Sequence, residues 1–90
     1  MSNDVNKIIV WTNPTAPFQK IYVMKEGVLV DQIGVRIDDV KDVVYALADK
    51  YNIFDINFSG APTYGEKIAK DIENGQIIHY GKNKITVTFV

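Results

Sequence analysis

The chain has 90 residues, of which 47 % are hydrophobic and 23 % charged, with a formal net charge of −1. This composition indicates one globular domain over residues 1–90, and the absence of cysteine excludes disulfide frameworks, thiolate metal sites and cysteine nucleophiles. A near-neutral charge with a single arginine argues against a strongly basic nucleic-acid clamp, and no apolar run is long enough to span a membrane.

The first half of the chain predicts three strands. Residues 8–12 form a β-branched and aromatic run, which the turn-forming segment 13–17, with two prolines, brings to an end. Two further strands, 21–24 and 28–35, are joined by residues 25–27, where a glycine can adopt a left-handed turn conformation. The pattern predicts a hairpin and, with the first strand, an antiparallel meander.

Helical spacing replaces the strand pattern from Asp38 onward. The apolar row of this helix comprises Val40, Val43, Val44, Leu47, Ala48 and Tyr51. Asp38 or Asp39 can cap its start, and Asn52 suits its end. Residues 53–58 predict a fourth strand directly after it. Because a helical crossover separates this strand from the meander, we expect it to pair in parallel with a meander strand.

A second helix and a last strand complete the chain. Thr63 and Glu66 have capping-box spacing, ahead of an apolar stripe. Residues 74–80 fit either a continuation of this helix or a strand, and the local pattern leaves both open. Residues 84–90 alternate cleanly and predict a strand. The element order is βββαβαβ, which predicts an α/β (α+β) fold with a mixed sheet of about five strands and two helices.

Two segments resemble a known group of proteins. Residues 56–69, INFSGAPTYGEKIA, resemble the strand–Gly-x-x-x-Tyr–helix junction of small uncharacterised phage and prophage proteins that carry a truncated ribonuclease H-like domain. The polar break after Tyr80, followed by a final strand, is similar too. The resemblance implies a ribonuclease H-like half-fold, a second helix reaching about Tyr80, and a viral or mobile-element origin. It implies no established activity.

The residues that nuclease chemistry requires are absent from the first strand. Ribonuclease H-like nucleases hold two metal ions with an aspartate on that strand and other carboxylates nearby, whereas residues 7–12 contain no acid. We therefore interpret Asp31 and Asp55 as solvated or strand-end carboxylates, and His79, the only histidine, as a surface or partly packed residue. The sequence predicts no catalytic residue, no metal ligand, no cofactor and no enzymatic activity.

One strand-to-helix junction is the best place for a small ligand. Its candidate residues for ligand or anion binding are Ser59, Gly60, Thr63, Tyr64 and Lys67. Free N–H groups at a helix start attract anions, and ligands favour the carboxyl ends of parallel strands. A phosphate loop is disfavoured because Glu66 stands where that motif needs lysine. The alternative, which the pattern favours, is that this junction is a purely structural strand-to-helix turn.

An aromatic and proline-rich edge is the candidate surface for a partner. It comprises Trp11, Pro14, Pro17 and Phe18, since aromatic side chains dominate interface hot spots. The alternative is a core tryptophan with the loop folded over it. An open sheet also leaves two unpaired strand edges, which favours a homo-oligomer over a monomer.

These observations predict a non-catalytic binding protein, a phage or prophage accessory protein that acts through self-association or a protein partner. A nucleic-acid-associated protein of ribonuclease H-like descent is the first alternative, and a nucleotide- or anion-binding protein using the 59–67 junction is the second. We expect a cytoplasmic protein, in the host cytoplasm if it is phage-encoded, with no membrane partner.

Overall fold

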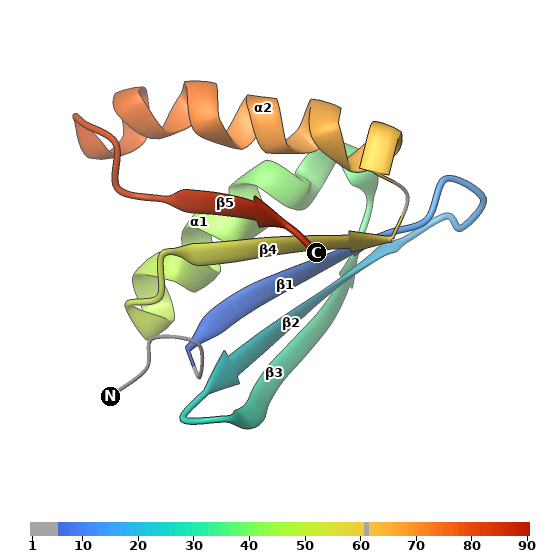
Figure 1. Ribbon diagram of the computed structural model, residues 1–90, viewed down its shortest axis with the longest axis horizontal. Coiled ribbons are helices and arrows are strands. Elements are labelled where there is room, and N and C mark those ends of the chain that lie inside the picture. Colours follow the sequence, from blue (N-terminus) through green and yellow to red (C-terminus); the bar gives the residue numbers. More distant parts are fainter. Residues whose placement is uncertain (1–5, 61) are drawn as a thin grey trace.

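The computed structural model describes residues 6–60 and 62–90, with side chains for 6–60 and 65–90 (Figure 1). Three strands come first, followed by a short 3-10 turn, and then helices alternate with strands. The elements are β1 (Lys7–Thr12), β2 (Gln19–Lys25), β3 (Val28–Val35), the 3-10 turn η2 (Ile37–Asp39), α1 (Val40–Tyr51), β4 (Asp55–Gly60), α2 (Pro62–Tyr80) and β5 (Thr86–Phe89). The predicted order βββαβαβ is confirmed.

All five strands form one mixed sheet in the order β3-β2-β1-β4-β5. The meander pairs antiparallel, β1 with β2 and β2 with β3. The strand after α1 pairs in parallel with β1, as predicted, and β5 extends the sheet in parallel beside β4. The sheet therefore ends in two edges, the eight-residue β3 and the four-residue β5.

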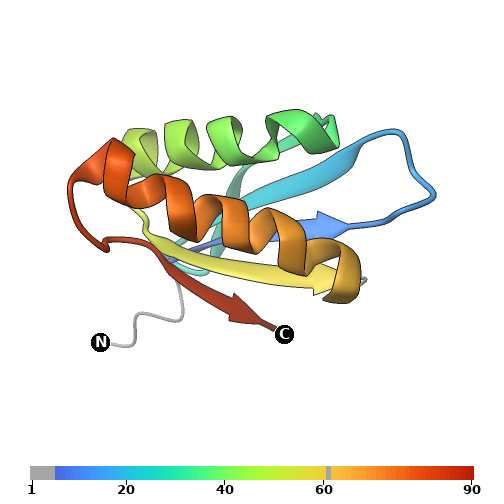
Figure 2. The ribbon, with the colours of Figure 1, turned by 90° about the horizontal axis from the view of Figure 1, so that it is seen from above.

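Both helices lie on one face of the sheet. Figure 2 shows α1 and α2 side by side above the strands, and no described helix covers the other face. Alternate strand residues point into this single core, where Ile8, Ile21 and Ile56 are fully buried. No helix in the described part of the chain is long and apolar enough to cross a membrane.

The boundaries of α1 and β4 differ from the sequence-based expectation. A 3-10 turn precedes α1, and Asp39 occupies the N-cap position without a side-chain cap bond, so the predicted aspartate cap is wrong. The predicted end is confirmed, because Asn52 adopts the left-handed conformation with φ 56°. β4 starts at Asp55 because buried Ile53 still belongs to the turn after α1, where its N–H bonds to the Ala48 carbonyl at 3.1 Å.

Helix α2 runs unbroken to Tyr80, which decides the ambiguous segment 74–80 in favour of a helix. Gln76, 3 % exposed, faces the core from this helix. Its Oε1 accepts hydrogen bonds from the backbone N–H groups of Lys84 (2.7 Å) and Ile85 (2.6 Å). The side chain thereby fixes the segment that leads into β5, a task that a strand at 76–80 could not perform.

Candidate interaction surfaces

The predicted ligand junction is tightly packed where the structure describes it. A Cβ on Gly60, whose φ is +101°, would collide with the Thr12 carbonyl, so β1 and β4 approach closely at their ends. The Thr12 hydroxyl donates to the Ser59 carbonyl at 3.2 Å. The hollow beside these residues measures about 30 Å³, which is room for a water molecule rather than a nucleotide.

The other residues of that predicted site do not extend this hollow. Lys67 lines a different groove, between η2 and α2, together with Asp38 and Asp71. The side chains of Thr63 and Tyr64 lie outside the described residues. Glycines at the junction serve close packing, since a Cβ on Gly65 would lie 3.3 Å from the Phe58 ring. The described residues therefore form no nucleotide pocket.

Carboxylates do not converge in the described part of the chain. Asp31 accepts a hydrogen bond from the Tyr51 hydroxyl at 2.9 Å, and its carboxylate lies 4.0 Å from the Lys50 ammonium. Asp55 stands at the start of β4, and two strands, β2 and β1, separate β4 from β3, the strand of Asp31. No three acidic or histidine side chains among residues 6–60 and 65–90 are arranged to hold a metal ion.

His79 belongs to a surface cluster that ties the end of α2 to α1. Its Nε2 lies 3.2 Å from the Asp49 carboxylate, and its ring stacks on Tyr45 with the centroids 4.8 Å apart. The bond from His79 is the main reason why the pKa of Asp49 is lowered. Burial raises the pKa values of Tyr45 and Tyr80, with neighbouring carboxylates adding to the effect. We interpret this cluster as a structural link between the two helices.

The predicted partner surface is exposed. Trp11 is 41 % exposed and Phe18 54 % exposed, and Pro14 and Pro17 are also exposed. The loop between β1 and β2 is not folded over Trp11, so the core alternative for this residue is wrong. Trp11 is exposed because its side chain points away from the helices, on the uncovered side of β1.

Sequence reasoning missed the residue that organises this loop. Gln19, 1 % exposed, opens β2 and points into the core. Its Oε1 accepts from the Asn13 N–H at 2.6 Å, and its Nε2 donates to the carbonyls of Asn13 (3.2 Å) and Ala16 (3.4 Å). A polar residue at the first inward position of a strand, beside a loop with free backbone groups, is the signal that could have identified it.

The uncovered side of the sheet is called the open face below. It alternates with the core positions, and strand register places one row across all five strands. This row consists of Gln32, Tyr22, Ile9, Asn57 and Thr88. In the adjacent row, Trp11 stands between Lys20 on β2 and Ser59 on β4.

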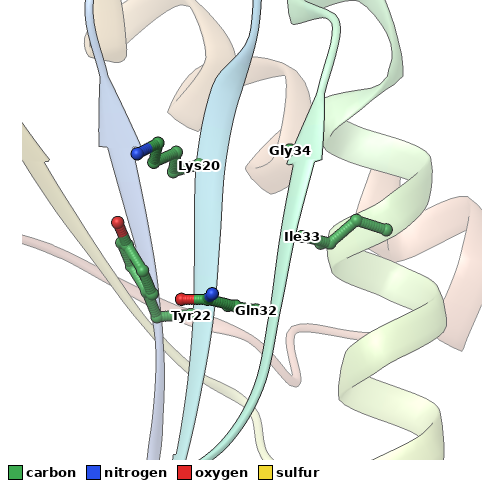
Figure 3. Close-up of a pocket in the computed structure, with 5 residues that line it drawn as sticks. All are labelled: Lys20, Tyr22, Gln32, Ile33 and Gly34. Atoms are coloured by element: carbon green, nitrogen blue, oxygen red, sulfur yellow. The ribbon is translucent and has the colours of Figure 1, made fainter.

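The open face is hollowed where β3 lacks a side chain. Above Gly34 lies a shallow hollow of about 170 Å³ lined by Lys20, Tyr22, Gln32 and Ile33. Figure 3 shows Lys20 and Tyr22 leaning from β2 toward β1, whereas Ile33 points the other way, toward α1. An ammonium, a phenol and an amide thus surround a space large enough for a few water molecules or one ring.

The β3 edge is apolar and unusually free of charge. Its exposed large side chains are Val28 (61 %), Leu29 (47 %), Val30 (44 %) and Ile33 (42 %), called the β3 edge patch below. Asp31 is the only charged residue of the strand, and its carboxylate is turned toward Tyr51 of α1. Natural edge strands are normally protected by lysine, proline or short length, none of which β3 has, or by a bulge or an inward-pointing charge. The protection that β3 has is the register irregularity between Leu29 and Asp31 and the inward-turned Asp31 carboxylate.

Comparison of the chain with protein-family models, with curated proteins and with solved structures gives no match.

Proposed function

We propose that this protein is a non-catalytic interaction module that forms a homodimer by pairing β3 with β3 of a second copy. The observation that carries the proposal is the β3 edge patch: eight residues of edge strand with four large apolar side chains exposed. An edge strand presents unpaired N–H and C=O groups, and another extended strand is the partner that matches them.

A second copy suits this edge better than an unrelated strand because the contact is isologous. The β3–β2 register is continuous from Asp31 to Val35, a regular stretch that contains Ile33 of the patch. The irregularity falls between Leu29 and Asp31, so the other three patch residues lie at it or on its hairpin side. Antiparallel pairing about a two-fold axis normal to the sheet brings apolar residues opposite one another. The register that would set Asp31 against Asp31 is unfavourable, since like charges directly opposite destabilise a pair.

Such a dimer would have one ten-stranded sheet, with the helices of both copies on the same side. The two open faces would then be continuous on the other side. The proposal extends to the fold and origin of the protein. The βββαβαβ order supports a ribonuclease H-like half-fold. We propose that the chain is a phage or prophage accessory protein that acts in the host cytoplasm without catalysis.

Sedimentation equilibrium tests the dimer. The wild-type chain should sediment with twice the monomer mass, and Val28→Lys and Val30→Lys should each shift the equilibrium to monomer while circular dichroism stays unchanged. Ile78→Lys is the matched control, because Ile78 is 91 % exposed on α2, remote from β3, and this variant should remain dimeric. A wild-type protein that stays monomeric at every concentration, or a dimer disrupted equally by the control, overturns the proposal.

A further inference from the structure

The charges of this near-neutral protein are segregated between its two layers. Within the described residues, the helices and the 3-10 turn carry more acids than bases, namely Asp38, Asp39, Asp42, Asp49, Glu66, Asp71 and Glu73 against Lys41, Lys50, Lys67 and Lys70. The strands and loops carry more bases than acids, namely Lys7, Lys20, Lys25, Arg36, Lys82 and Lys84 against Glu26, Asp31 and Asp55. Strands and loops together therefore carry a net positive charge, which the net charge of the chain conceals, although the strands alone carry three lysines against two aspartates.

Aromatic rings occupy the uncovered side of the sheet. Trp11 on β1 pairs with Lys20, and Tyr22 stands two residues further along β2, so the two rings are diagonal neighbours. Diagonal positions on adjacent antiparallel strands lie about 7–8 Å apart. No described carboxylate lies within ion-pair distance of the exposed Lys20 ammonium between them.

We propose that the open face binds single-stranded nucleic acid, with unpaired bases stacked on Trp11 and Tyr22 and a backbone phosphate on Lys20. Flat rings accept any base, and stacking combined with a lysine is the recurring chemistry of single-strand recognition on sheets. The amide group of Gln32 lies in the row of Tyr22 and can bond to base edges, whereas the amide of Asn57 in the same row donates to the Asp55 carboxylate at 3.4 Å.

The shape of the open face favours a single strand over a duplex. The five-stranded face is wider than the helix or two-stranded ribbon that the major groove admits, and no arginine lies on it to read base pairs there. The hollow of about 170 Å³ above Gly34 has room for one ring beside the Tyr22 hydroxyl and the Lys20 ammonium. This inference goes beyond the proposed dimer and does not depend on it, because all of these residues belong to one copy.

The test uses the fluorescence of Trp11, which is the only tryptophan in the chain. Titration with a short oligothymidylate at low salt should quench this fluorescence saturably, and added salt should weaken the binding. Tyr22→Ala should weaken it about five- to hundredfold through the lost stack. Lys20→Ala should lower the slope of log affinity against log salt by about one.

Two variants separate binding from folding. Lys70→Ala removes an exposed lysine from α2 on the opposite layer and should leave the affinity unchanged. Gly34→Val fills the hollow, since a Cβ there meets only ordinary contacts, the nearest being Phe18 Cβ at 3.8 Å. It should therefore weaken binding severalfold while leaving the unfolding midpoint equal or higher.

Four results overturn the inference. They are an absence of saturable quenching at low salt, equal quenching by a duplex, equal affinity for thymidine monophosphate, and equal losses in Lys20→Ala and Lys70→Ala. A Trp11 signal that changes on concentrating the protein alone assigns the open face to a protein contact instead. Monomeric protein that binds the oligonucleotide would refute the β3 dimer and leave this inference standing.

Discussion

Replacing Gln76 by leucine would keep a side chain of similar size in the core but remove its hydrogen bonds. In the native protein, Gln76 accepts from the N–H groups of Lys84 and Ile85 at 2.7 and 2.6 Å, and its amide reaches the Ile85 carbonyl at 3.4 Å. These bonds join α2 to the segment that leads into β5. The variant leaves two backbone donors, one of them buried, without their partner.

The loss can be estimated from these groups. A buried donor left without a partner costs about 1–3 kcal/mol, with the partly exposed Lys84 N–H at the lower end. Burial of leucine in place of an amide returns about 1 kcal/mol. We expect the free energy of unfolding to fall by about 1–3 kcal/mol, a large part of the stability of a small domain.

Urea denaturation followed by circular dichroism measures this loss. With a slope of about 1–1.5 kcal/mol per molar urea, the midpoint of Gln76→Leu should fall by about 1–3 M. Hydrogen exchange should accelerate most at the amides of Lys84 and Ile85. Glu73→Gln, an exposed position on the same helix, should change stability by less than about 0.5 kcal/mol. A midpoint shift below about 0.5 M, or unchanged exchange at those two amides, refutes the reasoning.

Three further predictions concern packing and pH. Gly75→Ala should destabilise the fold by about 1–3 kcal/mol, because its Cβ would lie 2.6 Å from the Tyr45 hydroxyl. Adding Tyr45→Phe to the same chain should recover part of this loss. If the effects of the two substitutions on the denaturation midpoint are simply additive, the explanation is contradicted. Gly60→Ala should lower the thermal midpoint more than any other glycine-to-alanine change, because both the φ of +101° at Gly60 and its contact with β1 forbid a Cβ. An unchanged thermal midpoint would show that the β1–β4 contact can relax. Since the folded-state pKa of Asp49 is lowered, its contribution to stability is present above the unfolded pKa near 3.8 and is lost as the pH falls through the folded value. Asp49→Asn should therefore differ from wild type at pH 6, and the difference should shrink as the pH falls below the unfolded pKa; a difference in denaturation midpoints that stays constant on acidification would rule out the ionised carboxylate.

Much of the fold could be derived from local pattern. Alternation and helical spacing are properties of each segment, so they located the hairpin, the row from Val40 to Tyr51 in α1, and the last strand. The parallel pairing of β4 with β1 followed from chain geometry, because a helical crossover returns the chain in the same direction. The segment 74–80 could not be decided locally, since the bonds that fix Gln76 come from residues that follow the helix.

The candidate sites were less accessible to the sequence. The pattern located Trp11 and Phe18 beside a proline loop, but it could not tell an exposed ring from a buried one. It also grouped Lys67 with Ser59 because they are close in sequence, whereas the helix carries Lys67 to another groove. The loop-holding function of Gln19 depends on carbonyls that only the folded loop turns toward its amide.

Taken alone, the sequence determined the identity and order of the strands and helices, because hydrophobic period and turn chemistry act over a few neighbouring residues. Only the tertiary structure decided which side of the sheet both helices cover, and hence which residues stay uncovered. That choice separates the acidic helices from the more basic strands and loops and leaves Trp11, Lys20 and Tyr22 together on one face. Burial and charge segregation arise from contacts between segments distant in sequence, and no local pattern encodes them.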